Sequence, residues 1–116
     1  MKAVAFIYGD EGRWDSLADD ERKAIYAQYR AFGEAAGEKV TGGAELTSTR
    51  SATTVRVRDG QTIVTDGPFA ETKEQLGGFY ILDCESLDEA AELAAQIPGA
   101  ATGTIEVRAA HEEESP

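Results

Sequence analysis

Asp66 is the residue whose neighbours best suit it to acid or base chemistry. It ends a run of β-favouring residues and precedes Gly67, which tolerates unusual backbone angles, and Pro68, which fixes one. Such a turn can hold a carboxylate rigidly at the mouth of a cleft, where partial burial would make it a stronger base. The alternative interpretation is structural: the Asp66 side chain would accept hydrogen bonds from the backbone of its own turn.

A small anion is the ligand favoured by the charges around this turn. From residue 50 to residue 73 the chain carries four basic and three acidic residues, whereas the whole chain has a formal net charge of −11. An anion therefore meets less repulsion here than elsewhere on the molecule. We expect Lys73 and Arg56 to orient such a ligand, with Gly67 and Pro68 shaping the turn beside it. For Lys73 the alternative is a solvated loop, in which surface ion pairs contribute about 0–1 kcal/mol.

Two tyrosines are candidates to line the pocket for such a ligand. Tyr8 and Tyr80 fall in predicted strands that we expect to lie side by side, and a tyrosine can hydrogen-bond a ligand while its ring forms a wall. The alternative is that both are core or interface residues, and they belong to a site only if they face the cleft beside Asp66. Trp14 lies in a predicted loop before the first helix, where its ring would either cap the core or close a pocket, and we favour the role in the core.

Neither a metal nor another cofactor is expected. Cys84 is the single cysteine, which excludes an intrachain disulfide and a multi-cysteine metal site. It falls in a predicted buried strand beside Asp83 and Glu85, and these surroundings should raise the pKa of its thiol and disfavour nucleophilic catalysis. The single histidine, His111, lies in an acidic terminal segment that cannot hold a metal-binding geometry.

The elements that must position these residues follow from hydrophobic periodicity. An Asp-Gly pair at residues 59 and 60 between two β-rich runs is typical of a hairpin. Ser86 begins a capping box for the second helix. The pattern predicts strands at 2–8, 44–49, 53–58, 61–65, 79–84 and 104–108, and helices from about 16 to 37 and from 87 to 97.

The order of these elements predicts the fold. It is β-α-β, a hairpin, then β-α-β, which indicates an α+β ferredoxin-like sandwich with an inserted β-hairpin. Both helices would cover one face of a mainly antiparallel sheet. If Phe6, Tyr8, Tyr80 and Leu82 lie on the other face, a second subunit must cover them, so we expect a homodimer. We expect a single domain at 1–109 and a flexible acidic tail at 110–116.

Length, composition and charge exclude several classes of protein. A chain of 116 residues with 41% hydrophobic and 28% charged residues is typical of one globular domain and not of a disordered or fibrous protein. A pI near 4.4 opposes binding to a phosphate backbone, so no nucleic-acid partner is expected. The apolar run at residues 3–7 is too short for a signal peptide or a membrane span, which predicts a cytoplasmic protein without membrane contact.

Four segments together form a pattern known from one protein family. They are FIYGD at 6–10, TTVRVRDG at 53–60, VTDGPFAETKEQLGGFY at 64–80 and IPGA at 97–100. From residue 2 to about 109 the chain thereby resembles the YCII-related family, in its DGPF-containing branch. The resemblance implies a dimeric α-β barrel of the ferredoxin-like kind. Some relatives carry a His-Asp pair proposed as catalytic, whereas the single histidine here lies in the tail.

Two functions follow from these observations, and whether the chain is an enzyme is left open between them. The first is a cofactor-free cleft for a small anionic organic molecule, with Asp66 as acid or base, Lys73 and Arg56 orienting the ligand, and Tyr8 and Tyr80 lining the pocket. The second is a non-enzymatic ligand-sensing or protein-interaction module with a transcription-regulator partner, because the resemblance implies an association with sigma factors. A third interpretation is a structural dimer without a ligand.

Overall fold

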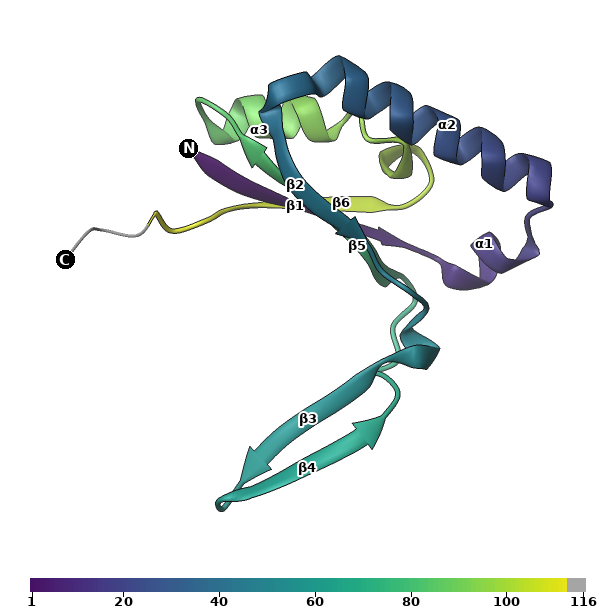
Figure 1. Cartoon of the computed structure of the whole chain (residues 1–116), viewed down its shortest axis with the longest axis vertical. Coiled ribbons are helices and arrows are strands. Elements are labelled where there is room, and N and C mark those ends of the chain that lie inside the picture. The colour runs from purple at the N-terminus through teal and green to yellow at the C-terminus, as the bar shows by residue number, and fades with distance from the viewer. Residues whose placement is uncertain (113–116) are drawn as a thin grey trace.

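A layer of helices lies over a four-stranded antiparallel sheet, and a separate two-stranded hairpin extends from the other side (Figure 1). The computed structural model describes residues 1–112. The main sheet has the strand order β2 (Val40–Glu45), β5 (Gln75–Asp83), β1 (Lys2–Gly9) and β6 (Thr104–Ala109). The hairpin consists of β3 (Thr53–Arg58) and β4 (Gln61–Asp66). The helices are α1 (Glu11–Ser16), α2 (Asp19–Ala36) and α3 (Leu87–Ala94), and the short 3-10 turns are η1 (Gly37–Lys39), η2 (Thr49–Ser51) and η3 (Pro98–Ala101).

The α+β class and the antiparallel sheet expected from the sequence are confirmed. β1 pairs antiparallel with β5 and β6, and β5 pairs antiparallel with β2. The connections through α2 and α3 cross the same face of this sheet, so both helices cover one side of it (Figure 1). None of the helices within residues 1–112 has the length and apolar character needed to cross a bilayer.

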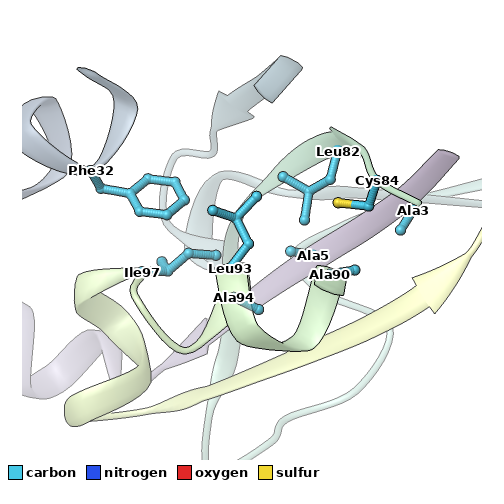
Figure 2. Packing of buried hydrophobic residues seen from close by; sticks show 9 residues of the cluster. All are labelled: Ala3, Ala5, Phe32, Leu82, Cys84, Ala90, Leu93, Ala94 and Ile97. Atoms are coloured by element: carbon cyan, nitrogen blue, oxygen red, sulfur yellow. The ribbon is translucent and has the colours of Figure 1, made fainter. Parts of the chain in front are cut away.

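The hydrophobic core lies between the helices and the sheet. Leu82 of β5 and Ile97 after α3 are its largest fully buried side chains, and Phe32 of α2 points toward them (Figure 2). Ala3 and Ala5 of β1 are fully buried beneath α3, where small side chains let the helix approach the strand closely. Burial of a leucine or isoleucine side chain contributes about 1.5–3 kcal/mol, so this layer carries most of the stability.

The predicted first helix is in fact two helices, which corrects the expected start near residue 16. Asp10 caps α1 by accepting the backbone N–H two residues on, at 2.8 Å. Ser16 caps nothing and donates instead to a carbonyl of α1. The guanidinium group of Arg22 donates to the carbonyl oxygens of Trp14 and Asp15, which satisfies the open end of α1. Trp14 therefore lies in a helix and not in a loop, with its ring 5.5 Å from that of Tyr26.

The second strand begins earlier than predicted, at residue 40 and not at 44. The predicted strand started only after the glycine pair 42–43, but both glycines lie inside β2. A Cβ added at Gly43 would collide with the carbonyl oxygen of Phe79 on β5, so only glycine allows the two strands to pair this closely. For the same reason Gly78 lies within β5, which begins at residue 75 and not at 79.

The face of the main sheet opposite the helices, called the bare face below, carries Phe6 and Tyr8 of β1. Their neighbours Ala3 and Ala5 point into the core, and successive residues of a strand alternate between faces. Leu82 and Tyr80 were also expected on the bare face, and this is corrected: both point toward the helices. Leu82 is fully buried, and the Tyr80 ring lies 5.2 Å from that of Phe32.

The hairpin of residues 53–66, called the arm below, is confirmed as predicted. Asp59 and Gly60 have φ angles of 52° and 74°, the left-handed pair that a tight two-residue hairpin turn requires. The arm extends away from the helices, on the side of the bare face (Figure 1). Its reach raises the radius of gyration to 16.4 Å, against about 13 Å for a compact chain of this length.

The end of the chain is described only as far as residue 112. The backbone N–H of Ala110 donates to the carbonyl oxygen of Lys2 at 2.9 Å, so contact with β1 continues one residue past β6. The remainder of the predicted acidic tail, 113–116, lies outside the described residues.

Candidate functional site

Asp66 lies at the end of β4, at the base of the arm, and its carboxylate is exposed. Within residues 1–112 its side chain takes part in no hydrogen bond. The turn that follows is held by other groups: the N–H of Gly67 donates to Ala52 at 2.7 Å, and the Thr54 hydroxyl donates to the Gly67 carbonyl at 2.8 Å. The φ of Gly67 is 96°, which explains the glycine there. The turn thus does not depend on the Asp66 carboxylate, which leaves that group available to a ligand.

Arg56 and Lys73 are not brought to Asp66 within one chain. Residues paired across a hairpin share a face, so Asp66 shares its face with Thr53, whereas Arg56 lies on the other face with Ile63. Lys73 is exposed in the loop between Asp66 and β5, and no ion pair in the described part of the chain includes it. These three charged side chains therefore form no single cluster in the monomer.

Tyr8 and Tyr80 lie on paired strands, as expected, but point to opposite faces of the sheet. Tyr80 packs on Phe32 in the helix layer, and burial raises the pKa of its hydroxyl. Tyr8 is half-buried on the bare face. The two tyrosines cannot line one pocket of a single chain, which corrects their expected pairing.

A polar group beside Tyr8 was missed by the sequence analysis. Tyr8 pairs with Thr104 of β6 across the sheet, so their side chains share the bare face. The Thr104 hydroxyl donates to the carboxylate of Glu74 at 2.8 Å. We call Tyr8, Glu74 and Thr104 the polar rim. Residues 8, 74 and 104 are far apart in sequence, and they come together because β5 and β6 both pair with β1 near Tyr8.

The bare face next to the polar rim is apolar on β1 and β5, whereas β6 adds Glu106 opposite Phe6 and Arg108 opposite Val4. Phe6 pairs with Phe79, and Val4 pairs with Ile81, so these four side chains form a continuous patch in which each is half-buried. A mostly apolar surface with a few polar groups at one end is the usual composition of a small-molecule site. Two shallow hollows of the described chain lie elsewhere, beside η3, and contain none of the predicted site residues.

Helix α1 fixes the base of the arm. The Glu11 carboxylate accepts the Thr49 N–H at 2.7 Å, the Thr49 hydroxyl at 2.8 Å and the Ser48 hydroxyl at 3.3 Å. The N–H of Glu11 donates to the side chain of Gln75 at 2.9 Å, at the start of β5. Glu11 therefore ties together the segment before β3, through its carboxylate, and the strand after the arm, through its backbone N–H, which sets the direction in which the arm leaves the sheet.

Cys84 is buried and does not suit nucleophilic chemistry. Burial, and then the nearby Glu89 carboxylate, raise the pKa of its thiol. The expected rise in the pKa of the Cys84 thiol is therefore confirmed, and its main cause is burial. Lys39 pairs with Glu89 at 2.8 Å across this end of the core. Within residues 1–112 no three His, Cys, Asp or Glu side chains gather as metal ligands would.

Comparisons with known proteins agree with this architecture. The YCII-related domain family matches residues 1–113. An uncharacterised protein of Rhizobium meliloti (strain 1021) is 47% identical over 115 residues, which span 93% of this chain and 90% of that protein. Among solved structures, the chain is similar to 5-chloro-2-hydroxyhydroquinone dehydrochlorinase (TftG) from Burkholderia phenoliruptrix, in complex with 2,5-dihydroxybenzoquinone.

The likeness to TftG is one of fold. The TM-score is 0.56 at 19% identity, over 97% of this chain and 96% of that one. The resemblance to the YCII-related family inferred from the sequence motifs is confirmed by the family match, whereas the DGPF branch stays a prediction. Since the match spans nearly the whole chain, this protein belongs to the YCII-related domain family.

Proposed function

We propose that this protein binds a small anionic organic molecule in a cofactor-free cleft, formed where the bare faces of two identical chains meet. The observation that carries the proposal is the bare face itself: an apolar patch around Phe6 and Phe79 that ends at the polar rim. An apolar sheet face without a cover needs a partner. A second copy placed there would enclose the rim and exclude water from it.

The relative of known structure supports a ligand of this size. TftG shares the fold over nearly its whole length and holds 2,5-dihydroxybenzoquinone, a single ring that carries four oxygen atoms. A ring of that kind matches the bare face in character, because its plane can lie on aromatic side chains such as Phe6 while its oxygens meet hydroxyl and carboxylate groups. We therefore take small hydroxylated ring acids as the first ligand class to test.

The proposed roles follow the position of each residue. Tyr8 would hydrogen-bond the ligand at the polar rim, and Asp66 would act as the acid or base, since its carboxylate is exposed and its turn is held by other groups. Arg56 and Lys73 would orient the anion, and Gly67 and Pro68 would shape the turn. Because Tyr80 faces the helices, it would support the sheet from behind and not touch the ligand.

A non-enzymatic protein-interaction module, working with a transcription regulator, is the second candidate. It is favoured by the exposed apolar side chains on the arm, because exposed apolar surface marks sites of protein contact. Under this alternative the polar rim has no ligand, and changes to Tyr8 or Asp66 would leave the protein's activity in the cell unchanged.

Calorimetric titration distinguishes these functions. Wild-type protein is titrated with 2,5-dihydroxybenzoquinone and with a panel of small aromatic and enolic acids, beside Tyr8→Phe and Asp66→Asn. The exposed Glu92→Gln on α3, on the helix side of the sheet, serves as the charge control. We expect saturable binding that Tyr8→Phe and Asp66→Asn weaken at least tenfold, about 1.4 kcal/mol, while the control leaves it unchanged. No saturable binding across the panel, or equal binding by all variants, would contradict the proposed function.

A further inference from the structure

The two faces of the arm differ in chemistry, as the faces of a half-buried sheet do. The cross-strand register places Val55, Val57 and Val64 on one face, and Arg56, Arg58 and Ile63 on the other. This alternation is typical of a sheet that packs one face on a core and leaves the other in water. Yet the three valines are 59%, 59% and 61% exposed. The valine face therefore has no cover within the described residues.

The position of the arm indicates where its cover lies. The arm leaves the sheet on the side away from the helices and extends below the bare face (Figure 1). A molecule seated on the bare face would therefore have the arm along its flank. The hydrogen bonds of Glu11 to Ser48 and Thr49 hold the arm in this direction. The two uncovered apolar surfaces thus border one space.

The bare face alone is small for a stable interface. Four strands about 4.8 Å apart, each paired over about six residues of 3.3 Å rise, cover roughly 400 Å². A stable interface buries about 800 Å² on each partner. Contacts outside the main sheet would enlarge the interface toward that size, and the arm is the apolar surface next to it.

Charge favours a second copy of this chain as the occupant. The arm contains two arginines and two aspartates and is neutral, although the whole chain has a formal net charge of −11. Two copies repel each other through their acidic bodies, and the neutral arm is the part that approaches another copy with the least repulsion. A two-fold dimer also covers both arms at once, because each contact is repeated by symmetry.

We propose that each arm packs its valine face against the body of a second copy of this chain, so that two chains clasp each other reciprocally. The inference rests on the proposed function for the seating of the second copy on the bare face. It adds that the arm is part of the interface, which extends the contact beyond the main sheet and closes one side of the ligand cleft. The other face of the arm, which carries Arg56 and Arg58, does not pack on that body and stays open to water and to the ligand.

Two neighbouring substitutions test which face of the arm is covered. Val64→Lys places a charge on the valine face, and Ile63→Lys makes a similar change on the other face, where Ile63 is 45% exposed. The dimer dissociation constant is measured by sedimentation equilibrium, with far-UV circular dichroism to check the fold. We expect Val64→Lys to raise this constant at least tenfold, the effect of losing an interface anchor, and Ile63→Lys to change it less than twofold.

Hydrogen exchange of wild-type arm amides gives a second test that needs no variant. An isolated two-stranded hairpin is marginally stable, so its amides exchange fast unless the arm is covered. We expect slow exchange for residues 54–65 in the dimer and faster exchange on dilution to monomer. Fast exchange at every concentration, or equal effects of the two lysine variants, would overturn the inference.

Phe6→Lys on the bare face separates this inference from the proposed function. If Phe6→Lys dissociates the dimer and Val64→Lys does not, the clasp is wrong and the cleft between bare faces stands. If only Val64→Lys dissociates it, the clasp stands and that cleft is wrong. A wild-type chain that is monomeric at all concentrations, including one that binds a different protein through its arm, overturns both.

Discussion

The main sheet and the arm are both made of antiparallel strands and differ in what covers them. In the arm apolar and polar residues alternate, whereas β1 and β5 of the main sheet carry apolar residues on both faces. The main sheet has helices on one face, and Leu82 there is fully buried, whereas Val55 at the centre of the arm is 59% exposed. The residue pattern of a strand therefore determines its local structure. How much the strand contributes to stability depends on whether other elements pack on it. The four predictions below test this difference in decreasing order of expected effect.

Truncation of one apolar side chain in each region gives the largest contrast. Leu82→Ala should lower the free energy of unfolding by about 2–5 kcal/mol, because it leaves a cavity in a filled core. Val55→Ala in the arm should change it by less than about 0.5 kcal/mol under monomeric conditions, as expected for a surface position. Urea denaturation measures both. Equal losses would show that the arm is packed within its own chain.

The junction between the two regions should depend on Glu11. Glu11→Gln should cost about 1–3 kcal/mol, because a half-buried carboxylate that accepts three hydrogen bonds is replaced by an amide that can accept them at only one oxygen. Asp15→Asn is the matched control, since Asp15 makes only an exposed ion pair with Arg50. Thermal unfolding should separate the two. If the control costs as much as Glu11→Gln, the role given to Glu11 is wrong.

Because Cys84 is buried in the core, the free energy of unfolding should depend on pH. Burial raises the pKa of this thiol, so the folded state keeps a proton that the unfolded state loses above about pH 8.5. Stability should be complete below that pH and fall as the pH rises toward the folded pKa, by less than about 1.4 kcal/mol per pH unit.

Urea unfolding of wild type and Cys84→Ala between pH 7 and pH 10 measures this dependence. The slope of the unfolding free energy against pH should be smaller in Cys84→Ala. The part that remains includes Tyr29 and Tyr80, whose pKa values burial also raises, and Tyr26 and Lys39, whose pKa values are raised mainly by hydrogen bonds to Glu45 and Glu89. Identical slopes in both proteins would exclude the assigned role of Cys84.

Asp66 at the base of the arm should have the smallest effect on stability. Asp66→Asn should change the free energy of unfolding by less than about 0.5 kcal/mol, because the following turn is held by Thr54 and by the Gly67 backbone. Thr54→Val removes one of those hydrogen bonds and should cost more, about 1 kcal/mol. A loss of 1 kcal/mol or more for Asp66→Asn would favour the structural interpretation of this residue.

Much of the fold could be predicted because it follows from local patterns. The Asp59-Gly60 turn is present as predicted, and Ser86 caps α3 by accepting the Glu89 N–H. The expected capping box is only half formed, because the Glu89 carboxylate accepts the N–H of Glu85 and not that of Ser86. The predicted second strand started only after the glycine pair at 42–43, because the need for glycine there arises from the close approach of β5. Likewise, the split between α1 and α2 depends on Arg22 reaching the end of α1.

The candidate site could be predicted only in part, for a related reason. Asp66 and Tyr8 were identified from residue type and local context. The faces of Tyr8 and Tyr80 depend on strand alternation relative to the helices. The contact of Glu74 with Thr104 depends on the registers of both β5 and β6 with β1. Such long-range relations carry no signal in a single sequence.

The central claim is that a second copy of this chain covers the bare face. Sedimentation velocity of the wild-type chain and of Phe6→Lys tests this claim most directly. At micromolar concentration we predict a wild-type species of about twice the chain mass of 12.4 kDa. Phe6→Lys, which places a charge in the centre of the apolar patch, should sediment as a folded monomer. A monomeric wild type, or a dimer that Phe6→Lys leaves intact, would contradict the claim.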